Sequence, residues 1–372
     1  MHEALTACSL PAHGGQFRAI AEQFAVPVDR LLDFSASIYP GGPSARVIQA
    51  LSDALRCSEQ LRRYPDLEST ELRSHLARYA GVPAANILVA SGAVSLISAT
   101  LRAIRAKKCL LPEPAFGEYR RVLERESIEI DTYPLVPELN FRPDLQRLFE
   151  HCIARGCDTV ILTNPHNPSG TTFGATEIRS VFKLAAQSGI RILLDEAFID
   201  FVPEHSVSSD VPMGSNLIVF RSVTKFFAMA GLRVAYVIAP SHLVSKVAAL
   251  LDPWSVSILA SIAACAAVDD RTYIADTIHC SSVEREWLSS TLAEMGFTVF
   301  LSRANFLLFR FPEELRNTGA WEELIVRHGI IIRNCATFEG LDESYLRTAV
   351  RGREDNQQLI RALTSLISSR EP

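Results

Sequence analysis

Lys225 stands among residues whose types and spacing suit chemistry on an amino group. It lies thirty positions after Asp195 and eight before Arg233, and all three lie at the ends of apolar segments. An amine can form a Schiff base with an aldehyde, a carboxylate can hold a protonated ring nitrogen, and a guanidinium can bind phosphate. The three groups together predict a site for pyridoxal 5′-phosphate, in which Lys225 and Asp195 are the catalytic residues.

Two further segments place polar groups where a cofactor would bind. Asp195 ends the apolar run 192–194, and Gly92 and Ala93 follow the apolar run 87–90 and open a helical pattern. Ligands of open α/β sheets bind at the carboxyl ends of strands, and a helix N-terminus offers free N–H groups to a phosphate. The alternative for Asp195 is an aspartate that only caps a helix or closes a turn.

The segment Asn-Pro-His-Asn-Pro-Ser-Gly at 164–170 follows another strand-like run. Its prolines and glycine predict an irregular, fixed loop at the ligand-binding edge of the sheet. Asn167 is therefore a candidate donor to the phenolic oxygen of the cofactor. The alternative is a rigid turn whose asparagines bond only to the backbone.

The elements that must position these groups alternate between strand and helix in the first two thirds of the chain. This alternation predicts a mostly parallel sheet with helices on both faces. The remainder predicts a smaller α+β domain. Strands are expected at 87–90, 109–111, 159–163, 191–194, 217–221, 234–238, 298–301, 305–310 and 330–333. Helices are expected at 44–57, 68–80, 93–105, throughout 242–294, at 319–328, and from 353 onward.

Composition excludes several other classes of protein. The chain has 372 residues, 48% of them hydrophobic, with a net charge of −5, which predicts a soluble two-domain protein without a basic surface for nucleic acid or anionic membrane. Eight cysteines form no C-x-x-C pair, so neither a metal site nor a disulfide framework is indicated. The apolar run 258–268 is too short to span a bilayer, and the start lacks signal-peptide character. We expect a cytoplasmic enzyme with reduced thiols.

The order of the motifs carries a resemblance to a known family. Asn-Pro-x-Asn-Pro-Ser-Gly, Asp-Glu-Ala-Phe, Ser-x-Thr-Lys and Gly-x-Arg occur in the order typical of class I/II, fold-type I aminotransferases that use pyridoxal phosphate. The segments 13–15, 33–35, 64–66, 195–201 and 253–256 are similar to the threonine-phosphate decarboxylase branch of cobalamin biosynthesis, which is close to histidinol-phosphate aminotransferases.

The resemblance implies a reaction, two domains and a homodimer. The implied reaction is decarboxylation of L-threonine O-3-phosphate to (R)-1-amino-2-propanol phosphate. The alternatives are an aminotransferase, of histidinol-phosphate type or acting on another acidic or phosphorylated amino acid, and a non-catalytic binding protein of the same fold. The implied large domain spans 44–241. The small domain comprises 242–372 with the N-terminal arm 1–43, and the active site lies between the domains and across the dimer interface.

The resemblance also implies a set of site residues, matched by position. The ring would be held by Asp195, Asn167 and Phe116, and the cofactor phosphate would be held by Gly92, Ala93, Ser222, Thr224, Arg233 and, from the neighbouring subunit, Tyr64. The substrate would be held by His13, Ser35, Arg333 and Arg347. The alternatives without a role in the site are a loop histidine at position 13, a core aromatic residue at position 116 and a solvated strand end at position 333.

The sequence departs from the decarboxylase pattern at several positions. The family loop Ser-x-Asn-x-Asn-Pro has Ser37 and Tyr39 at its two amide positions, and Val94 and Ser95 replace a polar residue and an acid after the phosphate-loop glycine. Ser91 and Ser257 each stand where the family has an asparagine. These changes affect side chains on the substrate side, so the sequence predicts cofactor binding more directly than it predicts the substrate.

Overall fold

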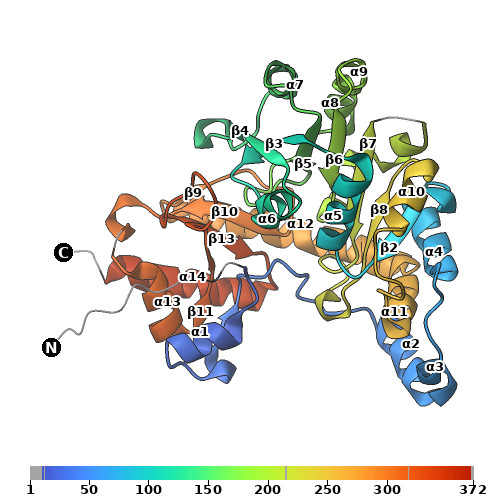
Figure 1. Ribbon diagram of the computed structural model, residues 1–372. Helices are drawn as coiled ribbons and strands as arrows, with labels where there is room; N and C mark the ends of the chain where they lie inside the picture. The colour runs from blue at the N-terminus through green and yellow to red at the C-terminus, as the bar shows by residue number, and fades with distance from the viewer. Residues whose placement is uncertain (1–10, 12, 214–215, 317, 370–372) are drawn as a thin grey trace.

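The computed structural model describes residues 11, 13–213, 216–316 and 318–369. Its centre is a seven-stranded sheet in the order β2-β8-β7-β6-β5-β3-β4. The pairs among β4, β3, β5, β6 and β7 are parallel, while β8 runs antiparallel to both β2 and β7. Helices lie on both faces of this sheet, as Figure 1 shows. The predicted α/β architecture with a mostly parallel sheet is therefore confirmed.

The strands of this sheet match most of the expected ranges. Their bounds are β2 Ile87–Ala90, β3 Lys108–Glu113, β4 Glu129–Pro134, β5 Thr159–Thr163, β6 Arg191–Asp195, β7 Leu217–Ser222 and β8 Ala235–Ile238. Only β4 was not expected from the sequence. It forms one edge of the sheet, and its mixed polar sequence leaves Glu129 exposed, so it lacks the continuous apolar run of a central parallel strand.

Helices pack on the sheet in two groups. One face carries α5 (Ala93–Ile104), α6 (Glu118–Arg125) and α10 (Ser241–Ala248). The other carries α2 (Ala45–Arg56), α4 (Thr70–Ala80), α7 (Leu145–Ala154), α8 (Ala175–Ser180), α9 (Phe182–Gln187) and α11 (Ile258–Val268). Short α3 (Ser58–Arg62) follows α2. The hydroxyl of Ser44 accepts from Val47 N at 3.3 Å, and Gly81 ends α4 with φ of 68°, which confirms both expected helix ends.

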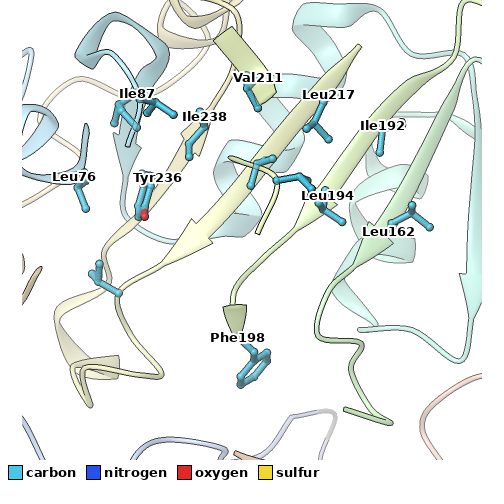
Figure 2. Packing of buried hydrophobic residues seen from close by; sticks show 14 of the residues in the cluster. Leu76, Ile87, Leu162, Ile192, Leu194, Phe198, Val211, Leu217, Tyr236 and Ile238 are labelled. Atoms are coloured by element: carbon cyan, nitrogen blue, oxygen red, sulfur yellow. The ribbon is translucent and has the colours of Figure 1, made fainter. Parts of the chain in front are cut away.

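The second group of helices closes a large hydrophobic core. Figure 2 shows Leu76 of α4 beside Ile87 and Tyr236, with Leu194 farther along the same face of the sheet. Phe198, just beyond β6, lies toward the carboxyl edge of the strands. Burial of both sheet faces holds the strands rigidly in place, and the strands in turn fix the positions of the loops at their carboxyl ends.

A second layer of structure adjoins the first. A four-stranded antiparallel sheet has the order β12-β13-β10-β9, with bounds Arg333–Asn334, Tyr345–Ala349, Phe306–Arg310 and Thr298–Val299. It packs with α13 (Ala320–His328), α14 (Arg353–Ser368) and the long α12 (Arg271–Glu294). From the N-terminal region, α1 (Phe17–Gln23) joins this core, and β1 (Leu32–Asp33) pairs in parallel with β11 (Ile330–Ile331).

Two expectations about the C-terminal part were wrong in detail. The helical stretch 242–294 is three helices, because the chain leaves the helix twice. The first break, at 249–257, contains Pro253 and caps α11 through Ser257, and the second, at 269–270, caps α12 through Asp270. The expected strand 330–333 is two short strands that pair in different sheets, so Ile331 faces β1 while Arg333 faces β13. The chain from 258 to 268 is a helix in the large core, as expected.

The division into domains at 43/44 and 241/242 remains a prediction. The N-terminal residues Ile20, Val26 and Phe34 share a core with residues 288–366, as a joined arm would. In contrast, α11 lies beyond residue 242 but packs against α2 and α4 in the core of the large sheet. Among the described residues, no helix is long and apolar enough to cross a membrane.

Candidate active site

A cavity of about 450 Å³ opens at the carboxyl ends of β5, β6 and β7, where the four-stranded sheet and the N-terminal region meet the large sheet. It brings together residues that are widely separated in the sequence. Its walls include thirteen of the predicted site residues: His13, Ser35, Gly92, Ala93, Phe116, Asn167, Asp195, Ser222, Thr224, Lys225, Arg233, Arg333 and Arg347.

Asp195 ends β6 with its carboxylate buried in the floor of this cavity. Oδ1 accepts from the backbone N–H of Ala197 at 2.8 Å, and Oδ2 accepts from the hydroxyl of Tyr119 at 2.6 Å. Burial raises the pKa of the carboxyl, while these two hydrogen bonds and the charge of Lys225 oppose the rise. Asp195 thus closes a local turn, as one alternative expected, and also lines the cavity.

Lys225 lies in the loop that follows β7. Burial lowers the pKa of its amine to about 8, and the positive charges of Arg347 and Arg233 act in the same direction, while Asp195 opposes them. A larger share of the amine is therefore neutral at physiological pH than for an exposed lysine, as a nucleophile requires. The backbone N–H of Tyr39 donates to the carbonyl of Lys225 at 3.0 Å and fixes this loop from outside the cavity.

The first turn of α5 forms one end of the cavity and suits a phosphate. Gly92 precedes the helix with φ of 101°, and a Cβ at this position would lie 2.9 Å from Nη2 of Arg233. The hydroxyls of Ser222 and Thr224 stand 2.7 Å apart beside it. A helix N-terminus, a guanidinium and two hydroxyls around a position without a side chain make a cradle for a phosphate.

Arg347 reaches the cavity from β13, a strand not expected from the sequence. Its guanidinium is buried and donates to Oδ1 of Asn167 and, at 3.3 Å, to the carbonyl of Ser35. A guanidinium only donates, so its contact assigns Oδ1 to the Arg347 side and leaves Nδ2 of Asn167 to donate elsewhere. Burial lowers the pKa of Arg347 to about 10, and the charge of Arg333 adds to this, so the group stays charged at neutral pH.

The N-terminal segment covers one side of the cavity. The backbone N–H of Gly15 donates to the Ser35 hydroxyl at 2.8 Å, and that hydroxyl donates to Asp33 at 2.6 Å. A Cβ on Gly14 would lie 2.1 Å from the carbonyl oxygen of Ser35, so this contact requires glycine. The first glycine of the His-Gly-Gly motif thus serves close packing, while His13 itself lies against the cavity.

His13 and Arg333 lie on the same side of the cavity. Nε2 of His13 is 2.9 Å from Glu118, and its ring centroid is 5.9 Å from that of Phe116. Arg333 is 5% exposed, which contradicts the alternative of a solvated strand end, and it donates to the carbonyl of Pro11 and the hydroxyl of Thr337. Burial lowers its pKa. Phe116 faces the cavity, which favours a ring contact over a place in the core.

Tyr64 is the predicted site residue that this cavity does not include. Its side chain is 80% exposed and stands 4.9 Å from the ring of Trp254. Among the departures from the family pattern, Ser37 and Val94 line the cavity. Ser95 instead donates to the carbonyl of Gly92, and Ser257 caps α11, so both have local structural partners. Ser91 is exposed at the start of the same turn.

Several cavity residues were not singled out from the sequence. Glu118 and Tyr119 lie two and three positions after Phe116, and Thr163 ends β5 beside Asp195. The sequence offers one signal for Tyr119, which is an aromatic residue with a polar end three positions after the predicted ring contact Phe116. Its contact with Asp195 could not be read from the sequence, because Tyr119 lies beyond β3 and reaches Asp195 only when β3, β5 and β6 bring their carboxyl ends to one edge.

The cavity fits pyridoxal 5′-phosphate. An amine of lowered pKa, a buried carboxylate and a cradle without a side chain at Gly92 occupy positions that suit the aldehyde, the ring nitrogen and the phosphate of this molecule. The residues that would hold it are Lys225, Asp195, Asn167, Phe116, Arg233 and the first turn of α5. Fold and site together define an enzyme that uses pyridoxal phosphate.

Comparison with known proteins identifies the family. Residues 29–363 match the model for "Aminotransferase class I and II", and the chain belongs to this family, whose cofactor is pyridoxal 5′-phosphate. It is 32% identical to threonine-phosphate decarboxylase of Salmonella typhimurium, over 97% of this chain and 98% of that protein.

Two solved structures extend the comparison. The histidinol-phosphate aminotransferase of Clostridium acetobutylicum has a TM-score of 0.83 at 29% identity, covering 91% of this chain and 100% of that one. The L-threonine-O-3-phosphate decarboxylase of Porphyromonas gingivalis has a TM-score of 0.78 at 25% identity, covering 90% and 99%. The chain is therefore an enzyme of the decarboxylase or aminotransferase type, as the motifs predicted.

Proposed function

We propose that the enzyme decarboxylates a phosphorylated amino acid, L-threonine O-3-phosphate, to (R)-1-amino-2-propanol phosphate and CO₂. The observation that carries the proposal is the buried guanidinium of Arg347. Its acceptors, the amide of Asn167 and the carbonyl of Ser35, are neutral, and its Nε has no hydrogen-bond partner in the described part of the chain. A buried cation of this kind is costly until an anion joins it, so the site calls for an anionic substrate.

Two positions for anions support a substrate with two anionic groups. Arg347 shares Asn167 with the cofactor side of the cavity, so we assign it the carboxylate attached to the reacting carbon. Arg333 and His13 lie beside the N-terminal segment, and we assign them the phosphate at the other end. Threonine phosphate carries both groups, whereas histidinol phosphate carries a phosphate and no carboxylate.

Each site residue would then have a separate role in the proposed reaction. Bound pyridoxal phosphate supplies an electron sink for the pair released when a bond to the reacting carbon breaks. Asp195 would hold the ring nitrogen, Asn167 would orient the ring through its phenolic oxygen, and Phe116 would lie against the ring face. Arg347 and Arg333 would set which bond stands perpendicular to the ring. After CO₂ leaves, Lys225 in its protonated form would donate a proton to the carbon that lost the carboxylate, and its amine would become neutral.

An aminotransferase is the second candidate, and the likeness to the Clostridium acetobutylicum structure favours it. Incubating the cofactor-loaded enzyme with threonine phosphate separates the two. Release of CO₂ with one equivalent of amino-propanol phosphate supports the decarboxylase. Transfer of nitrogen from histidinol phosphate to 2-oxoglutarate, with no CO₂ from threonine phosphate, would refute the decarboxylase and support the aminotransferase. Lys225→Ala controls for reaction by free cofactor and should lose either activity.

A homodimer is part of the proposal because Tyr64 faces solvent in the isolated chain. Around it, α2, α3 and the loops near them expose apolar side chains, namely Ile48, Leu55, Leu61, Leu67 and Trp254. Exposed apolar groups gathered on one part of a surface mark contact sites. A second copy packed here would cover them and bring Tyr64 to the neighbouring phosphate cradle.

Mixing two inactive variants tests this arrangement. In a dimer of Tyr64→Ala with Lys225→Ala, one site would carry both substitutions and the other neither. Co-expression in equal amounts should therefore restore about a quarter of the activity, since half of the dimers would be mixed. If Tyr64 acts within its own subunit, mixing restores nothing. A monomeric enzyme in sedimentation would reject the dimer itself.

A further inference from the structure

We propose that Tyr119 is a positioning residue that fixes the Asp195 carboxylate and thereby keeps the proton of the cofactor–Asp195 pair on the ring nitrogen. Tyr119 is 1% exposed and extends from α6 to the end of β6, where its hydroxyl lies 2.6 Å from Oδ2 of Asp195. This role of Tyr119 concerns the cofactor, so it holds whether the enzyme decarboxylates or transaminates its substrate.

The direction of the hydrogen bonds follows from the chemistry of the groups. An ionised carboxylate can only accept, so the single proton of the Tyr119 hydroxyl is donated to Asp195. The same hydroxyl lies 3.1 Å from Oγ1 of Thr163, and because its own proton is used, Thr163 must be the donor in that contact. Thr163, Tyr119 and Asp195 therefore form a directed chain that ends on the carboxylate.

This series of hydrogen bonds acts on both the orientation and the charge of Asp195. Ala197 N–H occupies Oδ1 and the Tyr119 hydroxyl occupies Oδ2, so rotation of the carboxylate would break one bond or the other. Two titratable groups act on the carboxyl, Tyr119 from α6 and Lys225 from the loop after β7. The hydroxyl favours the ionised carboxylate, and an ionised carboxylate is the form that holds a protonated ring nitrogen.

Packing fixes Tyr119 independently of its hydroxyl. Its ring stands at 86° to that of Phe116, with the centroids 5.5 Å apart, and belongs to the hydrophobic core on the α5 and α6 face of the sheet. Tyr119→Phe keeps this packing and removes only the hydroxyl. Tyr236→Phe is the matched control, because Tyr236 is a buried tyrosine of the same sheet whose hydroxyl has no hydrogen-bond partner in the described part of the chain.

The test is the ¹⁵N resonance of the ring nitrogen in enzyme loaded with ¹⁵N-labelled pyridoxal phosphate, at fixed pH. In Tyr119→Phe the ratio of proton on nitrogen to proton on Asp195 should fall roughly tenfold, the factor that one hydrogen bond to a charged group supplies. Tyr236→Phe should leave the resonance in place. An unmoved resonance in Tyr119→Phe, or an equal shift in both variants, overturns the proposal.

A second variant covers the case in which Tyr119→Phe does not fold. Thr163→Val leaves Tyr119 in place and removes the donor behind it, so the resonance should move in the same direction by a smaller amount. An unchanged resonance there would count against the chain of hydrogen bonds. Because the ¹⁵N readout needs no substrate, this test can reject the role of Tyr119 while the proposed reaction stands. The proposed reaction can likewise be refuted while the role of Tyr119 stands.

Discussion

Replacing Arg347 by methionine should separate its role toward the substrate from its role toward Lys225. The buried guanidinium would place two hydrogen bonds on a substrate carboxylate. Each hydrogen bond to a charged group contributes about 1.5–3 kcal/mol. Loss of both predicts a fall in kcat/KM for threonine phosphate of about 10²- to 10⁴-fold.

The same substitution should also move the titration of Lys225. The Arg347 charge is the second cause, after burial, of the low pKa of this amine, which is about 8. Removing a nearby positive charge stabilises the protonated amine, so its pKa must rise. The pH midpoint for capture of pyridoxal phosphate by the apoenzyme, followed by absorbance, should therefore move above about 8 in the variant.

Arg310→Met is the matched control for both measurements. Arg310 lies on β10, next to β13 in the same sheet, and its partners Ser344 and Asp342 lie outside the cavity. It should change neither kcat/KM nor the Lys225 midpoint. If Arg347→Met keeps kcat/KM within a few-fold of the unsubstituted enzyme, Arg347 does not hold the substrate. If the midpoint stays in place, the electrostatic argument fails.

Two further predictions concern stability. Burial lowers the pKa of His166 from 6.5 to about 4, so between these values the unfolded chain binds a proton that the folded chain does not. The free energy of unfolding should therefore fall by up to about 3 kcal/mol as the pH drops through that window. His166→Gln should remove this pH dependence of the unfolding free energy, measured by urea titration. A slope that persists in the variant would assign it to other groups. Arg221 is buried against Asp200 and, at 3.8 Å, Glu196, so Arg221→Met should cost about 3–5 kcal/mol, with part recovered by adding Asp200→Asn. Arg179→Met breaks an exposed pair and should cost under about 1 kcal/mol; equal losses at the two sites would contradict the role of burial.

Local sequence was sufficient for the parts of the site that lie at strand ends. Asp195, Gly92 and Asn167 each follow an apolar run, and a parallel sheet brings the carboxyl ends of such runs to one edge. Lys225 and Arg233 were predicted by their spacing from Asp195 within the same region. The residues that follow strands could be assigned to one edge before the strand order was known, because any parallel arrangement of those strands gathers their carboxyl ends. Arg233 instead precedes β8 and reaches the same edge because β8 runs antiparallel to β7.

The substrate side depended on contacts that no local pattern encodes. Arg347 enters from β13, a short strand that is buried because it pairs with both β10 and β12, and the sequence around it gave no clear alternation. The N-terminal motif joins the site through the fit of Gly14 against Ser35, a contact between chain segments about 20 residues apart. The first contact is set by how the four-stranded sheet meets the large sheet, and the second by how the N-terminal segment folds back on itself.

Binding of pyridoxal phosphate follows from the sequence, because the amine, the carboxylate and the phosphate loop lie on elements whose order fixes their meeting point. The pKa values and orientations of those groups depend on the folded structure. The Tyr119 hydroxyl reaches Asp195, and Arg347 lowers the pKa of Lys225, through approaches between elements far apart in the chain. Hydrogen bonds and charges act over a few ångströms in space, and separation along the sequence does not report that distance.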